Sequence, residues 1–263
     1  ATLAAIVILG GIKRIGVVTE RLVPVMAAFY ILGAIFIVLS NITNVGSAFG
    51  LIFSSAFSPA SAVGGFAGST VAMAMRYGVA RGVFSNEAGL GSAPIAHAAA
   101  TTDHPVRQGL WGIFEVFMDT VVICTLTALS IIMSGVWNSG ETGSALTTAA
   151  FDSTIPFGGL IVSIGILLFA FSTILGWAYY GEKCIEFIAG TKAIFFYRLV
   201  YIPLIAVGAI GGLTTLWALS DTLNGLMAIP NLIGLLLLSP IVIKRTKEFF
   251  NKEYLEEKKE KAV

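Results

Sequence analysis

Charged residues are scarce in this sequence. Lys, Arg, Asp and Glu make up only 12% of its 263 residues, whereas 56% are hydrophobic, and the mean hydropathy is +0.89. A soluble domain carries about 25% charged residues and cannot bury this much apolar surface. The formal net charge of +1 gives no basic field for nucleic acid and no acidic excess typical of disorder. The composition therefore predicts a protein whose solvent is the lipid bilayer.

Cysteine is also rare. Cys124 and Cys184 lie in or beside apolar runs, and neither belongs to a C-x-x-C pair or a Cys/His cluster. This excludes the sequence patterns of a zinc site or a disulfide framework, and we expect both residues to be packing residues. The sequence also lacks the phosphate-binding glycine loop, the H-E-x-x-H motif and the G-x-S-x-G motif of soluble catalytic domains. We expect no enzyme activity and no cofactor.

Long apolar runs, by contrast, are abundant. A membrane-spanning helix needs about 20 predominantly apolar residues, and five segments reach or nearly reach this length. They are Pro24 to Asn41, Gly109 to Val136, Phe157 to Tyr180, Leu199 to Leu219 and Asn224 to Ile243. The predicted fold class is an all-α polytopic membrane protein. A shorter apolar run at the start of the sequence is interpreted as the truncated end of a further helix.

Basic residues indicate the orientation of these helices, because cytoplasmic loops carry an excess of Lys and Arg. We interpret the basic residues between positions 13 and 21 as one cytoplasmic loop and residues 244–263 as a cytoplasmic charged tail. Strict alternation then places the loops at 137–156 and 220–222 on the outer side. The predicted location is the cell inner membrane, with several crossings and a cytoplasmic C-terminus.

The stretch from Arg81 to Ala100 concentrates polar, small and helix-breaking residues. Two glycines and a proline within six positions weaken a helix, so we predict an interruption within Ser85 to Pro94. Non-helical backbone at membrane depth survives only where protein or a water-filled cavity surrounds it, and secondary transporters build their midplane sites from such broken helices. The break is therefore a candidate substrate site. The alternative is that Gly89 and Gly91 merely allow close helix packing.

The chemistry of this break suits a zwitterionic amino acid. Freed N–H groups and helix N-termini bind a carboxylate, whereas freed carbonyls and an amide side chain bind an ammonium. Asn86 is the best side-chain candidate. Glu87 should face the interior, form a pair or stay protonated, because a carboxylate facing lipid is costly. His97 is either a hydrogen-bonded packing residue or a proton relay.

Glu115 and Asp119 are four residues apart and therefore share one face of the predicted helix 109–136. We expect them to face the interior, either partnered or protonated. Ion passage or proton coupling is one interpretation, and a structural hydrogen bond to a neighbouring helix is the other. An intramembrane enzyme using both carboxylates and His97 is an alternative function, which their wide separation in the sequence does not support. Three threonines, Thr120, Thr125 and Thr127, are expected to bond the preceding turn or a neighbouring helix.

The run from Gly82 to Pro94 resembles the signature of the alanine or glycine:cation symporter family, a branch of the leucine-transporter-like fold. The resemblance continues through His104 to Gly109, Asp119-Thr120 and Phe171 to Trp177, and it covers nearly the whole chain up to the charged tail. It implies a part of an inverted-repeat bundle with a discontinuous helix. Family members have a further N-terminal half, which supplies the other broken helix.

This resemblance also implies roles for particular positions. It implies that the first helix of the second repeat is unwound at its centre and binds substrate there. The residues of this centre are Ser85, Asn86, Glu87, Ala88 and Gly89. It implies that Ser172 and Thr173 lend oxygens to a sodium ion, with further oxygens from carbonyls outside this chain. Trp177 is implied as a pocket wall, with membrane packing as the alternative.

The expected organisation follows the two repeats. Residues 1–41 are the end of the first repeat, 42–81 an outer Gly/Ala/Ser-rich helical or re-entrant connection, 82–243 the transmembrane core of the second repeat, and 244–263 the tail. The expected function is symport of alanine or glycine with Na+ as the coupling ion, in contact with the lipid bilayer and without nucleic acid. A proton-coupled amino-acid transporter and a non-transporting receptor or scaffold of the same fold are the alternatives.

Overall fold

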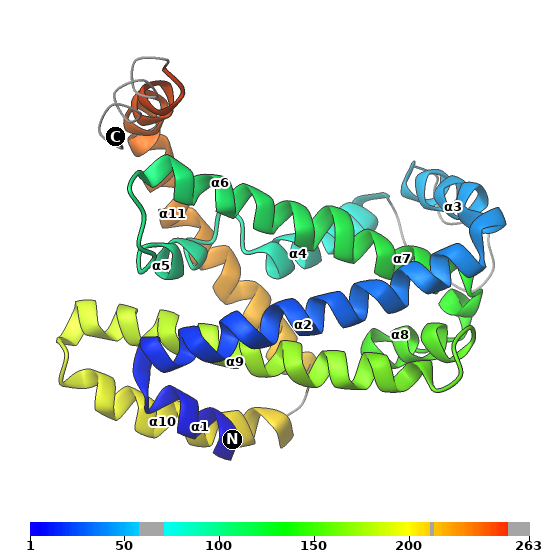
Figure 1. Cartoon of the computed structure of the whole chain (residues 1–263), viewed down its shortest axis with the longest axis horizontal. Helices are drawn as coiled ribbons and strands as arrows, with labels where there is room; N and C mark the ends of the chain where they lie inside the picture. Colours follow the sequence, from blue (N-terminus) through cyan, green and yellow to red (C-terminus); the bar gives the residue numbers. More distant parts are fainter. Residues whose placement is uncertain (58–70, 211–212, 252–263) are drawn as a thin grey trace, which may run out of the picture. The chain divides into compact units, whose positions relative to one another are not determined.

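The computed structural model describes residues 1–57, 71–210 and 213–251, and within these ranges the regular secondary structure is entirely helical (Figure 1). Five helical spans in the described residues are long and apolar enough to cross a membrane: Gly11–Ser40, Pro105–Met133, Gly158–Ala189, Ala193–Ile210 and Thr215–Phe250. The prediction of an all-α chain with five such helices is confirmed, but the predicted span Leu199 to Leu219 is wrong in its bounds, because one helix ends at Ile210 and the residues from Leu213 belong to the next. The part of the predicted tail after residue 251 lies outside the described residues.

The structure describes the following helices. In order they are α1 (Thr2–Ile8), α2 (Gly11–Ser40), α3 (Val45–Phe57), α4 (Val71–Asn86), α5 (Ala93–His97), α6 (Pro105–Val116), the π-helical segment η3 (Phe117–Ile123), α7 (Cys124–Met133), α8 (Gly143–Asp152), α9 (Gly158–Ala189), α10 (Ala193–Ile210) and α11 (Leu213–Phe250). The segments α6, η3 and α7 form one continuous spanning helix.

Two predicted loops are wrong. The basic residues between positions 13 and 21 lie inside α2, which at about 1.5 Å per residue is about 45 Å long and exceeds the roughly 30 Å hydrocarbon core. Its first turns can therefore be polar. Residues 220–222 lie inside α11, because the charge of Asp221 is compensated by an ion pair with Arg81 and does not require a turn in water.

The described residues form two compact units. Unit 1 consists of residues 1–80 and 120–211, and unit 2 consists of residues 81–119 and 212–263. The division passes through η3. The predicted boundary between residues 81 and 82 falls inside α4, which continues to Asn86. The assignment of the chain to two repeats stays a prediction.

The core of unit 1 joins α2, α7, α8 and α9. Tyr30 on α2 stacks on Phe151 of α8 with 5.5 Å between ring centroids. Its hydroxyl lies 2.7 Å from the Thr127 hydroxyl oxygen. Thr127 donates its own hydrogen to the Ile123 carbonyl over 2.8 Å, so Tyr30 is the donor of the interhelical bond. Thr127 thus makes both contacts expected of it, a bond to the preceding turn and a bond to a neighbouring helix.

A pair of glycines lets α8 lie against the start of α9. A Cβ atom at Gly158 would collide with the Phe151 carbonyl, and one at Gly159 would lie 2.6 Å from the Asp152 carboxylate. The Gly159 N–H donates to Asp152 Oδ1 over 2.6 Å, which satisfies one of the amides that the first turn of a helix leaves without an intrahelical partner. A residue with a side chain at Gly158 or Gly159 would push the two helices apart.

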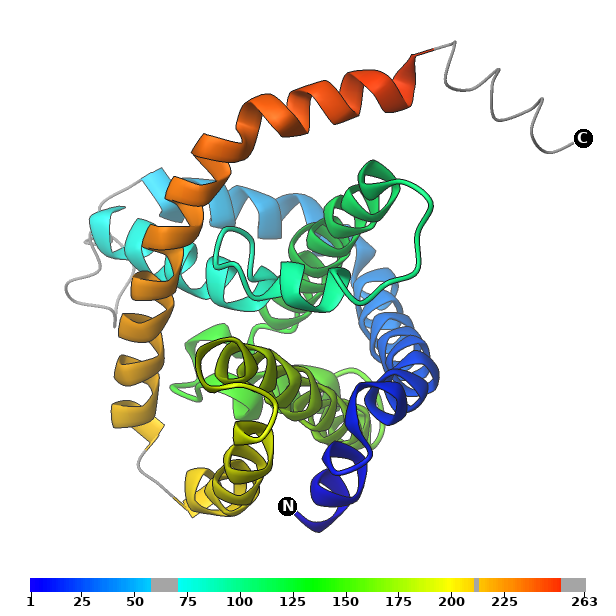
Figure 2. The ribbon, with the colours of Figure 1, turned by 90° about the vertical axis from the view of Figure 1, so that its left-hand side faces the viewer.

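Unit 2 consists of the end of α4, the α5–α6 hairpin and α11. Figure 1 shows α5 lying along α6 after the connection 98–104. The long helix α11 contains Pro230 and Pro240 and bends along its length (Figure 2). Proline removes a backbone hydrogen bond and pushes against the preceding turn, so a bend in a helix with two internal prolines has a local cause.

A buried ion pair links α9 to α10 in unit 1. The carboxylate of Glu182, which is 4% exposed, accepts two bonds from the Arg198 guanidinium, over 2.6 Å and 2.9 Å. Arg198 also reaches the Leu9 carbonyl over 3.4 Å. A charge in this position is tolerated only with a partner, so each residue depends on the other.

We expect Arg198→Ala to lower the free energy of unfolding by about 3–5 kcal/mol, because it leaves the buried Glu182 carboxylate alone. Glu182→Ala should cost less, because the Arg198 side chain that it leaves is 20% exposed, and the double variant should lose less than the sum of the two. Lys183→Ala breaks the exposed pair with Glu186 and a contact over the Tyr179 ring and should cost about 1 kcal/mol or less. Melting of the purified full-length protein in detergent measures these effects, and equal melting temperatures for Arg198→Ala and Lys183→Ala would contradict the prediction.

Candidate functional site

The predicted helix break is present. Helix α4 ends at Asn86 and α5 begins at Ala93, and the backbone between them is not helical. The prediction of an interruption within Ser85 to Pro94 is confirmed, but Ser85 and Asn86, which the resemblance implied to be unwound, lie in the last turn of α4. Glu87, Gly89 and Gly91 adopt φ values of +54°, +84° and +85°, in the left-handed region that is easy for glycine and unusual for glutamate. The glycines therefore make this turn possible.

Side chains within the break hold it in shape. The Ala88 N–H donates to Asn86 Oδ1 over 2.9 Å, which is the turn that asparagine forms with its own backbone. The hydroxyl of Ser92, which is 1% exposed, donates to Glu87 Oε2 over 2.6 Å. Glu87 is thus paired, as expected for a carboxylate in an apolar chain.

Helix α11 supplies a further contact. Asn231 donates from its amide nitrogen to the Gly89 carbonyl over 2.9 Å, and a Cβ atom at Gly91 would lie only 3.0 Å from the same side chain. The sequence interpretation did not single out Asn231. Its signal was a polar side chain directly after a proline within an otherwise apolar run.

The two carboxylates of the α6–η3 helix contact the two pieces of the broken helix. Asp119 Oδ1 accepts from the Ser85 hydroxyl over 2.8 Å, at the end of α4. Glu115 Oε2 lies 3.1 Å from His97 Nε2 on α5. Both carboxylates therefore have partners on neighbouring helices, as expected, but the expectation that Glu115 faces the interior is wrong, because its side chain is 66% exposed. The α5–α6 hairpin brings His97 and Glu115 together although 18 positions separate them in the sequence.

Asp119 lies in the π-helical segment η3, which the sequence did not predict. π-helical turns are rare, and they occur mostly as single bulges inside α-helices, frequently at functional sites. The segment consists of apolar residues around Asp119 and Thr120, and none of them is a helix breaker. Nothing local in the sequence distinguishes it from an ordinary turn.

Arg81 ties the last turns of α4 to α11. Its guanidinium pairs with Asp221 and lies 4.6 Å from the ring centroid of Trp217 and 5.4 Å from that of Phe84. A guanidinium over an aromatic face gains electrostatic attraction in addition to the ion pair. The break is thus anchored to α11 by both Arg81 and Asn231.

The other predicted site residues lie on α9, in unit 1. Ser172 donates to the Phe169 carbonyl over 2.9 Å, which is a bond to its own helix turn, and its oxygen lies 4.0 Å from Met26 Sδ. Thr173 is exposed. Trp177 packs edge-on against Tyr180 with 5.7 Å between centroids. Ser85 to Gly89 belong to unit 2, and the roles of both groups of residues in substrate and sodium binding stay predictions.

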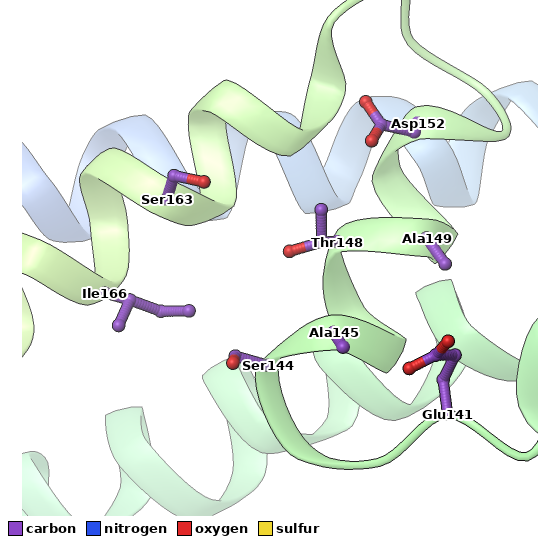
Figure 3. Close-up of a pocket in the computed structure, with 8 residues that line it drawn as sticks. All are labelled: Glu141, Ser144, Ala145, Thr148, Ala149, Asp152, Ser163 and Ile166. Atoms are coloured by element: carbon purple, nitrogen blue, oxygen red, sulfur yellow. The ribbon is translucent and has the colours of Figure 1, made fainter. Parts of the chain in front are cut away.

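Unit 1 also contains a cavity of about 500 Å³ between α8 and the first turns of α9 (Figure 3). Its lining combines two carboxylates, three hydroxyls and three apolar side chains. The lining residues are Glu141, Ser144, Ala145, Thr148, Ala149, Asp152, Ser163 and Ile166. None of the predicted substrate or sodium residues is among them, so the cavity does not support those assignments.

The family model described as "Sodium:alanine symporter family" matches residues 1–263. The chain belongs to this family. The resemblance inferred from the run Gly82 to Pro94 is thereby confirmed. Membership in the sodium:alanine symporter family, together with the five apolar helices, indicates that the chain belongs to a multi-pass membrane protein.

Individual members of the sodium:alanine symporter family cover nearly the whole chain. The sodium/alanine symporter AgcS of Methanococcus maripaludis is 53% identical over 253 residues, which is 95% of this chain and 55% of that protein. The protein named "Probable sodium/glutamine symporter GlnT" of Bacillus subtilis is 43% identical over 92% of this chain and 51% of its own length. The sodium/proton-dependent alanine carrier protein of Bacillus sp. strain PS3 is 37% identical over 88% and 56%. The chain spans about half the length of these relatives.

We expect Gly91→Ala to destabilise the full-length protein by about 1–2 kcal/mol, because alanine is disfavoured at a left-handed position and its Cβ would press on Asn231. The matched control is Gly82→Ala in α4, where a Cβ meets nothing within 4 Å and alanine is the better helix former. Thermal unfolding in detergent distinguishes the two. A melting temperature for Gly91→Ala that is not below that of Gly82→Ala would contradict this account of the break.

Proposed function

We propose that the full-length protein containing this chain is a sodium-coupled symporter of a small neutral amino acid, alanine or glycine. The observation that carries the proposal is the broken helix at residues 87–92 in a member of the sodium:alanine symporter family. The relative named as a sodium/alanine symporter supports alanine, whereas the name of another relative contains glutamine. The proposed architecture is a leucine-transporter-like inverted repeat. The proposed location is the inner membrane, with the C-terminus in the cytoplasm.

The proposed substrate site is formed by Ser85, Asn86, Glu87, Ala88 and Gly89. Three left-handed residues in the break turn its peptide groups away from the helix axis, so backbone N–H and C=O groups point in different directions near one place. Such a mixture of donors and acceptors suits an ammonium and a carboxylate on the same small molecule. Trp177 is proposed to limit the size of the pocket.

The proposed sodium ligands are the hydroxyls of Ser172 and Thr173. Sodium requires several hard oxygen donors, so carbonyl oxygens outside this chain must complete the site. The bond from Ser172 to the Phe169 carbonyl also fits the alternative, in which both hydroxyls only bond within their own helix. The sodium titration described below separates the two interpretations.

Proton coupling is the second candidate. The observation that favours it is the contact between His97 and Glu115, two titratable side chains beside the break. The name of one relative, a sodium/proton-dependent alanine carrier, agrees with it. A proton and a sodium ion could act on the same transporter at different places.

We expect the full-length protein in proteoliposomes to accumulate radiolabelled alanine under an inward sodium gradient, and Asn86→Ala to lower the uptake sharply. Because Asn86 also accepts the Ala88 N–H, Asn86→Asp is the matched variant: aspartate keeps this acceptor and removes the amide. Loss of uptake in both variants, with unchanged melting temperatures, supports substrate contact. Uptake retained in Asn86→Asp would reduce Asn86 to a turn residue, and no sodium-driven uptake of alanine or glycine by the wild type would overturn the proposed function.

We expect the double variant Ser172→Ala, Thr173→Ala to raise the sodium concentration for half-maximal uptake, because two oxygen donors are lost from a hard-cation site. The affinity for the amino acid should fall with it, since binding of the two ligands is linked. Ser163→Ala, on the same helix, is the control and should leave the sodium midpoint in place. Uptake is titrated against sodium with the amino acid below saturation. An unmoved midpoint in the double variant would make these hydroxyls packing residues.

A further inference from the structure

His97 is held between two side chains of the neighbouring helix. Its Nδ1 lies 2.7 Å from Gln108 Nε2, and its Nε2 lies 3.1 Å from Glu115 Oε2. Gly112 lies between these two on the same face of α6, and a Cβ atom there would be 3.7 Å from His97 Nε2. The ring therefore fits against α6 where a glycine leaves room, with a polar partner for each ring nitrogen.

These contacts are compatible with one tautomer of the ring. The Gln108 amide nitrogen can only donate, so Nδ1 accepts, and Nε2 carries the hydrogen that is donated to Glu115. This is the neutral imidazole. A half-turn of the Gln108 amide exchanges its nitrogen for its oxygen, and that oxygen can accept from a protonated Nδ1. The ring can thus take up a proton and keep both hydrogen bonds, with the positive charge facing the Glu115 carboxylate.

Most other charged groups of unit 2 have recorded partners of their own, and Glu87, in the break before α5, accepts from Ser92. Arg107, at the start of α6, pairs with Asp103 over 3.0 Å, and Asp119 accepts from Ser85. On α11 the ion pairs are Arg81 with Asp221 and Arg245 with Glu248, and the remaining charges of its described part are Lys244 and Lys247. Among the described residues, Glu115 is the charged side chain with a recorded contact to the His97 ring.

We propose that His97, Gln108 and Glu115 form a proton-binding site on the piece of broken helix that follows the break, and that its occupancy sets the pH dependence of transport. Imidazole is the side chain that changes charge between about pH 5 and 8. Proton uptake replaces a neutral contact between α5 and α6 by a charged one, which is stronger. Since α5 begins directly after residues 87–92, the strength of this contact acts on the geometry of the break.

The inference rests on the proposed transport function, so the experiment has one readout that depends on transport and one that does not. The first is sodium-driven alanine uptake by the full-length protein between pH 5 and 9. The second is an NMR titration of the full-length protein with isotope-labelled histidine, in which His97→Gln identifies the resonance of His97. Glutamine keeps a donor and an acceptor but does not titrate.

We expect the wild-type uptake to change with pH over this range, His97→Gln to flatten the profile, and Glu115→Gln to alter it, because the partner of Nε2 changes from a carboxylate to an amide. The matched control is His104→Asn, since His104 caps α6 by accepting the Val106 N–H and asparagine also caps helices. This variant should keep the wild-type profile.

Two results would overturn the proton site. One is a His97 resonance that keeps a single protonation state from pH 5 to 9, and the other is a wild-type pH profile retained in both His97→Gln and Glu115→Gln. If His97→Gln does not fold, the altered profile of Glu115→Gln and the wild-type titration decide. Absence of uptake in the wild type contradicts the transport function alone, because the NMR titration still reports whether His97 binds a proton.

Discussion

A helix that is broken inside an apolar protein must find partners for the polar groups around the break, because lipid supplies none. Unit 2 is arranged around this constraint. Asn86 and Ser92 bond to residues of the break from its two ends. Asp119 accepts from Ser85 at the end of α4, and Asn231 on α11 donates to the Gly89 carbonyl. The polar side chains of these otherwise apolar helices thus gather where the backbone departs from helical geometry, and the helices that carry them belong to one unit with the break.

The features of the fold that the sequence predicted are local ones. A run of apolar residues long enough to cross a bilayer is visible without knowing its neighbours, and the glycines and proline between Ser85 and Pro94 weaken a helix wherever it is placed. The loop predicted at residues 220–222 failed for the opposite reason. Asp221 is compensated by Arg81, 140 positions earlier in the chain, and no local pattern reveals that pairing.

The candidate site was likewise predictable only in its local features. Its central residues follow from helix breaking and from the family signature, whereas Asn231, the meeting of His97 with Glu115, and the buried pair of Glu182 and Arg198 depend on which helices become neighbours. Polar residues in apolar helices are the general signal for such contacts. The signal identifies the residues that need a partner, and only the structure identifies the partner.

The π-helical segment Phe117–Ile123 has a consequence for how this helix can vary in evolution. A π turn contains one residue more than the α turn that it replaces, and it is equivalent to a one-residue insertion. Removing a residue would restore α geometry and rotate one end of the helix against the other by about 100°. Glu115 precedes the segment and Thr127 follows it, so such a removal would turn these two side chains relative to each other. A one-residue deletion here is therefore expected to disturb this helix more than a substitution does.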